Sequence, residues 1–219
     1  MKEILKVNNV NYRYSDADKD DYVLRNINMS FEFGKSYAIK GRSGSGKTTL
    51  LSLISGLEKK YEGEILYDGN NLAKMDLDKY RNSDIGIVFQ SYNLLPQFTA
   101  EENIILSMDI SNVKDIDKKE KAIDLMKQVG LKPSLAKRRV LKLSGGEQQR
   151  IAIARSLSYN PKIIIADEPT GNLDKETEKE ILKIFNNLAH KENKCVIIVT
   201  HSPNVCNSVD KVFELKKSK

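Results

Sequence analysis

Two near-continuous apolar runs constrain the fold of this chain more than any other feature. They are KIIIADE at residues 162–168 and KCVIIVTH at residues 194–201, and they flank a segment from about 175 to 190 whose pattern predicts a helix. Strands that are apolar at successive positions are buried on both faces, as strands of parallel sheets are. The strand–helix–strand order therefore predicts an α/β fold with a parallel central sheet.

The rest of the chain supplies further strands and a helical insertion. Short strand-like runs broken by Gly, Asn and Asp fill most of residues 4–69, and DIGIVFQ at residues 84–90 resembles another buried strand. Apolar residues at helical spacing predict a helix over residues 48–57 and several between about 91 and 158. We therefore expect one domain over residues 1–219. Its core would comprise about 1–90 and 159–219, and its helical subdomain about 91–158.

The composition excludes several classes of protein. With 40% hydrophobic and 30% charged residues among 219, the chain reads as an ordinary globular protein. Its longest aliphatic runs, such as residues 196–199, are too short to span a bilayer, so we expect a cytoplasmic protein. Cys195 and Cys206 fit no metal or redox spacing, and two histidines are too few for a histidine-rich metal site. The net charge of +6 is spread along the chain, so no nucleic-acid partner is expected.

A glycine-rich loop predicts a phosphate-binding site. The segment GRSGSGKT at residues 41–48 matches the pattern G-x-x-x-x-G-K-[ST], with a strand-like run before it and a helix-like run after it. Glycines let the backbone N–H groups wrap a phosphate, and Lys47 brings a compact charge to the β- and γ-phosphates. The Thr48 hydroxyl is suited to Mg²⁺, and Thr49 is placed to reach the α-phosphate. The predicted nucleotide-binding residues here are Gly41, Arg42, Ser43, Gly44, Ser45, Gly46, Lys47, Thr48 and Thr49.

Candidate catalytic residues follow the ends of the predicted strands. Asp167 ends a buried strand, where α/β sheets place ligand-binding groups, and its carboxylate is suited to hold Mg²⁺ through water. Glu168, next to it, is a candidate general base for an attacking water. His201 follows another strand, in line with Gln90 and Asp167, which favours contact with a γ-phosphate. The guanine-specific pattern N-K-x-D is not matched, because NKCV at 193–196 has Val in the last position, so ATP is the expected nucleotide.

The segment LSGGEQQRIAIARSL at residues 143–157 begins a helix with two glycines, which cost helix stability. One interpretation is a capping box, in which Ser144 caps the helix and Glu147 completes it. The other is an anion site, because a helix N-terminus presents unpaired N–H donors and glycines let a phosphate come close. The residues of this segment alone leave both interpretations open.

Taken together, the motifs resemble those of the ATP-binding cassette (ABC) ATPases. The segment LSGGEQQR at residues 143–150 is similar to the signature motif of that family, and the resemblance covers essentially the whole chain. It implies a P-loop NTPase core with a parallel central sheet, an N-terminal antiparallel β subdomain and an inserted α-helical subdomain. The family's motifs occur in order as Tyr14, the phosphate loop 41–48, Gln90, the signature 143–150, IIIADE at 163–168, NLD at 172–174, and His201.

The resemblance also implies how two chains would cooperate. Two such domains pack head to tail on binding ATP, so that the signature helix of one covers the γ-phosphate held by the other. In this homodimer Asp174 would bridge the two copies, and the residues acting on the partner's nucleotide would be Ser144, Gly145 and Gly146. Gln90 would sense Mg²⁺ and the attacking water, and Tyr14 would stack on adenine. Tyr12 remains the alternative to Tyr14, because both could lie on the outward face of one strand.

Two longer segments, residues 89–104 and 167–174, resemble ATPase subunits of the lipoprotein-release and macrolide-export group. That group works with separate membrane subunits, so the resemblance implies an ATPase that exports peptides, lipoproteins or drugs. The protein would then lie at the inner face of the cell membrane, bound to transmembrane permease subunits through an exposed apolar cluster within residues 92–102. The alternative is a non-transport member acting on DNA or ribosomes. Such members usually carry long coiled-coil inserts or two tandem cassettes, unlike this chain.

Overall fold

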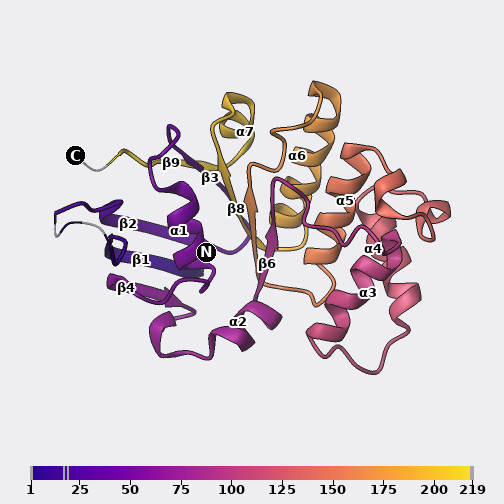
Figure 1. Ribbon diagram of the computed structural model, residues 1–219, viewed down its shortest axis with the longest axis horizontal. Helices are drawn as coiled ribbons and strands as arrows, with labels where there is room; N and C mark the ends of the chain where they lie inside the picture. Colours follow the sequence, from indigo (N-terminus) through magenta and orange to yellow (C-terminus); the bar gives the residue numbers. More distant parts are fainter. Residues whose placement is uncertain (1, 17, 19, 218–219) are drawn as a thin grey trace.

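A computed structural model describes residues 2–16, 18 and 20–217, and this part of the chain contains two β-sheets with helices around them (Figure 1). The central sheet has the strand order β6-β7-β8-β3-β9, and every neighbouring pair is parallel. Its strands are β3 (Ser36–Lys40), β6 (Ile85–Val88), β7 (Ile163–Asp167), β8 (Cys195–Thr200) and β9 (Lys211–Glu214). The predicted parallel sheet is therefore confirmed, and the apolar runs at 162–168 and 194–201 are its adjacent strands β7 and β8.

The two faces of this sheet bury different helices. Alternate residues of β7 point to opposite sides, because side chains alternate along a strand. Ile163 and Ile165 pack with the N-terminal sheet and α1 (Lys47–Ile54) in one apolar cluster. Ile164 and Ala166 pack in a second cluster with α5 (Gly145–Ser156) and α6 (Lys175–His190). In Figure 1, α1 and α5 accordingly lie on opposite sides of the central strands.

The second sheet forms the N-terminal side of the molecule. It is antiparallel, with the order β2-β1-β4-β5, and consists of β1 (Glu3–Tyr12), β2 (Leu24–Glu32), β4 (Glu62–Tyr67) and β5 (Asn70–Asn71). Strand β1 ends at Tyr12, so Tyr14 lies beyond the strand. The expectation that both tyrosines belong to the outward face of one strand is wrong, because the chain leaves the sheet between them.

The helical region lies against the second face of the central sheet. It contains α3 (Ala100–Ile110), α4 (Lys118–Gln128) and α5, which pack on one another. Residues 91–99 are not helical, because α3 starts only where Thr99 caps it and Glu102 completes a capping box. Two short helices, α2 (Leu77–Ser83) and α7 (Pro203–Ser208), complete the described structure together with three 3₁₀ turns. Among the described residues, no helix is long and apolar enough to cross a membrane.

Candidate functional site

The carboxyl ends of four adjacent strands bring most of the predicted site residues to one place. Because β6, β7, β8 and β3 are neighbours and parallel, the segments after them meet at the same edge of the sheet. A cavity of about 420 Å³ opens there. Its lining residues are Tyr14, Val23, Ser43, Gly44, Gly46, Lys47, Thr48, Thr49, Gln90, Asp167 and Glu168. The phosphate loop therefore faces the two candidate carboxylates across one cavity.

The phosphate loop presents bare backbone to this cavity. Gly44 and Gly46 have φ angles of 73° and 89°, a left-handed conformation that favours glycine, and a Cβ on Gly44 would meet nothing within 4 Å. Gly46 is also the N-cap of α1, and no side chain caps that helix. The first N–H groups of α1 are thus left available, and they form a suitable cradle for a phosphate at a helix N-terminus.

Lys47 lies over the loop that precedes it. Its Nζ donates to the carbonyl oxygen of Gly41 at 2.8 Å and to that of Arg42 at 3.1 Å. An ammonium group has three donors, so these two bonds leave one donor and the full positive charge for an anion in the cavity. The position suits contact with a phosphate.

The residues present also fit a magnesium ion. Thr48, Gln90 and Asp167 line the same cavity and supply a hydroxyl, an amide and a carboxylate, which are hard oxygen donors of the kind Mg²⁺ binds. Burial raises the pKa of Asp167, the neighbouring Glu168 carboxylate raises it further, and the Lys47 ammonium acts in the opposite direction. A bound dication would favour the charged form of this carboxylate. Mg²⁺ would therefore stabilise the ionised Asp167 that burial alone disfavours.

Glu168 and His201 form a hydrogen-bonded pair. His201 Nδ1 lies 2.7 Å from Glu168 Oε1, while Thr200 Oγ1 donates to Glu168 Oε2 at 3.2 Å. The backbone of Glu168 has a φ of 45°, a left-handed conformation that costs a non-glycine residue about 1 kcal/mol or more. His201 is largely exposed and does not line the cavity itself; it reaches the site through Glu168. Sequence analysis missed Thr200, although a hydroxyl at the end of an aliphatic strand is a recognisable signal.

Tyr14 and Tyr12 differ in accessibility. Tyr12 is buried at the end of β1, whereas Tyr14 is half-exposed, lines the cavity and shares a hydrogen bond of 3.2 Å between its hydroxyl and Thr49 Oγ1. The two rings meet edge to face with centroids 5.3 Å apart. Tyr12 thus supports the ring of Tyr14, and of the two only Tyr14 lines the cavity, where a flat base could stack on it.

The signature residues lie apart from this cavity. Ser144, Gly145 and Gly146 are not among its lining residues and begin α5, on the other face of the sheet from α1 (Figure 1). The predicted capping box is present: Ser144 Oγ accepts from the Glu147 N–H at 3.2 Å, and Glu147 accepts from the Ser144 N–H at 2.8 Å. A hydroxyl that accepts a hydrogen bond still carries a proton, so Ser144 remains able to donate to an anion.

Close packing within the same chain also explains why glycines occupy these two positions. A Cβ on Gly146 would lie 2.6 Å from Thr177 Cγ2, and one on Gly145 would lie 3.1 Å from the Tyr92 hydroxyl. The start of α5 is therefore packed closely against α6 and the loop after β6. Asp174, which lies just before Thr177 in the sequence, is the N-cap of α6. It accepts hydrogen bonds from the Thr177 backbone N–H and from the Thr177 hydroxyl. These hydrogen bonds lower the pKa of Asp174 and keep it charged.

Three comparisons with known proteins show which family the chain resembles. A family model described as ABC transporter matches residues 24–171. An uncharacterized ABC transporter ATP-binding protein of Bacillus subtilis, YclH, is 46% identical over 94% of this chain and 91% of its own length. The lipoprotein-releasing system ATP-binding protein LolD of Legionella pneumophila is 39% identical, covering 98% of this chain and 96% of its own.

Solved structures give the same result. The dimeric structure of MJ0796, a bacterial ABC transporter cassette, superposes with a TM-score of 0.88 at 37% identity, covering 97% of this chain and 94% of the other. A post-hydrolysis state of the same cassette, bound to ADP and Pi, also gives 0.88, at 35% identity over 99% and 97% of the two chains. The expected P-loop core, antiparallel subdomain and helical subdomain match this architecture. The chain therefore belongs to the ABC transporter family and is one of its ATP-hydrolysing cassettes.

Proposed function

We propose that this chain hydrolyses Mg²⁺–ATP as one half of a head-to-tail homodimer and thereby powers transport through separate membrane subunits. One observation carries the proposal. The phosphate loop, Asp167 and Glu168 share a cavity, whereas the residues Ser144–Gly146 begin a helix on the opposite face of the sheet. Under this proposal the signature residues of one copy complete the nucleotide site of the other, since the chain does not bring its own signature residues to its cavity.

Each residue of the cavity has a chemical task under this proposal. The backbone of the phosphate loop and Lys47 bind the phosphates, and Tyr14 stacks on adenine. Mg²⁺, held by Thr48, Gln90 and Asp167, would neutralise charge on the phosphates when bound. Glu168 accepts the proton of the attacking water, and its hydrogen bond with His201 keeps the carboxylate oriented.

The signature helix acts on the other copy's nucleotide. The N-terminus of α5 carries a partial positive charge, and the Ser144 hydroxyl and the bare backbone of Gly145 and Gly146 suit a γ-phosphate. Asp174, charged at the start of α6, bridges the two copies. The dimeric cassette structures at 37% and 35% identity support this arrangement, because the fold that they share with this chain is the same over nearly its full length.

The membrane partner follows from the family and from the relatives. The LolD proteins of Legionella pneumophila and Francisella tularensis are named as parts of lipoprotein-releasing systems, and they cover nearly this whole chain. We take the cargo to be a lipoprotein, a peptide or a drug exported by permease subunits. The cassette then lies at the inner face of the cell membrane. Nucleic acid is not part of this function.

The docking segment lies between β6 and α3. Leu94 packs against the core, and Leu95 and Phe98 are half-buried, so the apolar cluster expected to be exposed is only partly so. Asn103 holds this loop rigid: its side chain accepts from the Leu95 N–H at 2.8 Å and donates to the Leu95 carbonyl at 3.2 Å. A rigid surface with two half-exposed apolar side chains suits a short helix of a permease.

Charged substitutions in this segment test the partner. We expect the wild-type chain, tagged and isolated from detergent-solubilised membranes of its own cells, to co-purify with an integral membrane protein. Leu95→Glu or Phe98→Glu should abolish this co-purification by placing a charge in an apolar contact, while ATP binding measured by calorimetry stays unchanged. Val212→Glu, at an exposed apolar residue on the edge strand β9, is the control and should behave as wild type. Co-purification of the Leu95 and Phe98 variants at the wild-type level would place the docking surface elsewhere.

A further inference from the structure

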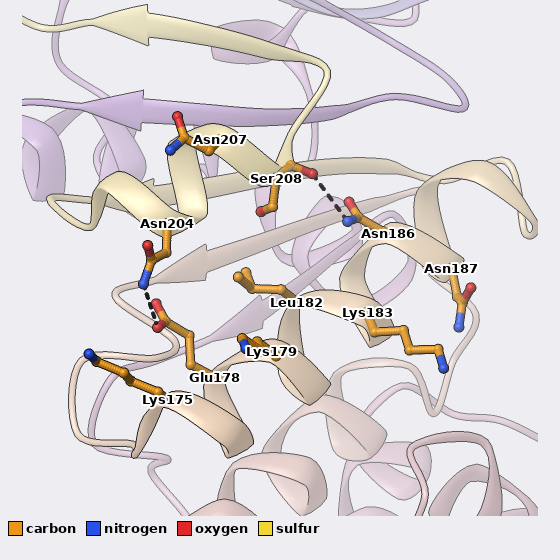
Figure 2. A pocket seen from close by; sticks show the side chains of 10 residues that line it. All are labelled: Lys175, Glu178, Lys179, Leu182, Lys183, Asn186, Asn187, Asn204, Asn207 and Ser208. Carbon is orange, nitrogen blue, oxygen red and sulfur yellow. Dashed lines mark hydrogen bonds between the residues drawn. The ribbon is translucent and has the colours of Figure 1, made fainter.

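A carboxylate outside the nucleotide cavity joins the two loops that carry Glu168 and His201. Glu178 lies in the first turns of α6, at one wall of a groove of about 460 Å³ between α6 and α7 (Figure 2). Its Oε1 accepts from Ser202 Oγ at 3.1 Å and from Thr170 Oγ1 at 3.4 Å. Its Oε2 accepts from Asn204 Nδ2 at 3.1 Å, the contact drawn as a dashed line in Figure 2.

Two of the donors to Glu178 come from the loops that hold the candidate catalytic pair, and the third, Asn204, belongs to α7. Thr170 is two residues after Glu168 and is buried, while Ser202 directly follows His201. Thr200 extends the connection, because its hydroxyl donates to Glu168 and accepts from the Ser202 N–H at 3.0 Å. Displacing either loop therefore requires breaking a hydrogen bond to Glu178.

The chemistry of these bonds makes Glu178 a link between the two loops, and its bonds from Ser202 and Asn204 are shorter than its bond from Thr170. A carboxylate offers about four lone-pair sites and accepts several donors at once, and hydrogen bonds to a charged acceptor are stronger than those between neutral groups. All three side-chain donors are neutral, so they hold the carboxylate without cancelling its charge. The side chain also belongs to a regular helix whose apolar face, with Ile181 and Phe185, is packed in the core. The two loops are thus fixed to a rigid element.

We propose that Glu178 is a positioning residue for ATP hydrolysis. It holds the loops after β7 and β8 at the separation that keeps Glu168 and His201 within hydrogen-bonding distance of each other. The inference rests on the proposed roles of Glu168 and His201 in hydrolysis. Glu178 contacts neither the nucleotide cavity nor those two residues directly; it acts through Thr170 and Ser202.

Steady-state kinetics of ATP hydrolysis separate this role from a merely structural one. We expect Glu178→Ala to lower kcat by about tenfold, because a small displacement of a positioned base has effects of that size or larger. The KM for ATP and the nucleotide affinity should change by less than about twofold, since the phosphate loop is untouched. Glu178→Gln should restore most of kcat: its Oε1 still accepts from Thr170 and Ser202, and the Asn204 amide can turn to accept from its Nε2.

Glu176→Ala is the matched control, the same substitution at an exposed residue of the same helix, and it should keep the wild-type kcat. Thr170→Val provides a second arm: combined with Glu178→Ala it should lower kcat no further than the more harmful single change, because both break the connection between Glu178 and the loop after β7. A Glu178→Ala protein with wild-type kcat, or one in which KM rises while kcat is unchanged, would overturn the inference. Loss of kcat in Glu178→Ala without rescue by Glu178→Gln would also overturn it.

A parallel Glu168→Gln variant tells this inference apart from the proposed function. If Glu168→Gln keeps full turnover, the proposed base is wrong whatever Glu178 does. If Glu168→Gln loses turnover and Glu178→Ala does not, the proposed function stands and only the positioning role of Glu178 fails.

Discussion

The Glu168→Gln variant is expected to hydrolyse ATP about 10²- to 10⁴-fold more slowly than the wild-type chain, the usual contribution of a positioned general base. The amide keeps the shape of the side chain and an oxygen that accepts from Thr200, but it has no basicity. It also removes a negative charge beside the position of the γ-phosphate, so ATP should be retained. Phosphate release at saturating Mg²⁺ and ATP measures the rate, and a filter-binding assay measures the retained nucleotide.

The adjacent carboxylate provides a comparison for this result. Asp167→Asn should impair hydrolysis by weakening Mg²⁺ binding, so raising the Mg²⁺ concentration should recover part of its activity. Glu168→Gln should not respond to Mg²⁺ in this way, because its defect lies in proton transfer. Phosphate release by Glu168→Gln at the wild-type rate would show that another group takes the proton.

Replacing Lys47 by Ala should weaken nucleotide binding by about tenfold or more, because it removes a charged donor from the phosphates. The fold should survive, since the two hydrogen bonds that are lost are local ones, to the carbonyl oxygens of Gly41 and Arg42 in the same loop. Calorimetric titration with ATP gives the affinity, and circular dichroism confirms the fold. Lys59→Ala, at an exposed lysine beyond α1, should bind as wild type. If Lys47→Ala binds ATP with the wild-type affinity, residues 41–48 are not the phosphate-binding loop.

The sequence was sufficient to predict the central sheet and the phosphate loop. Strands β7 and β8 were recognisable because they are aliphatic at nearly every position, which is required of a strand covered on both faces. The loop at 41–48 was recognisable because its chemistry demands glycines and a lysine at fixed spacing. The gathering of Gln90, Asp167 and Glu168 also followed, since parallel neighbouring strands end at one edge.

Other features depend on tertiary contacts that no local pattern carries. Helix α2 escaped prediction because only Leu77 and Tyr80 of its seven residues are buried, and the rest is polar. The exposure of Tyr14 relative to Tyr12 depends on where β1 ends. The end of a half-polar strand cannot be predicted from its residue pattern. The hydrogen bonds of Glu178 join α6 to two other segments, up to 26 residues away along the chain. In sequence, Glu178 looks like any charged residue on a helix surface.

The glycines at the start of α5 show why a sequence motif alone does not reveal its cause. Gly146 is needed where it stands because Thr177 of the same chain leaves no room for a Cβ. The capping box of Ser144 and Glu147 is likewise complete within the chain. Intramolecular packing therefore explains part of the motif, and the proposed contact with a second copy's γ-phosphate needs evidence of its own.

That evidence comes from sedimentation velocity of Glu168→Gln with and without saturating Mg²⁺–ATP, alone and combined with a change at Ser144. We predict that Glu168→Gln becomes a dimer holding two ATP molecules. Adding Ser144→Arg should leave it monomeric, with ATP still bound at its own phosphate loop. Ser144→Asp should do the same, and because Asp is as good an N-cap as Ser, its effect would come from repulsion of the partner's phosphate and not from a damaged helix. Double variants that dimerise with ATP as well as Glu168→Gln alone would contradict the head-to-tail site.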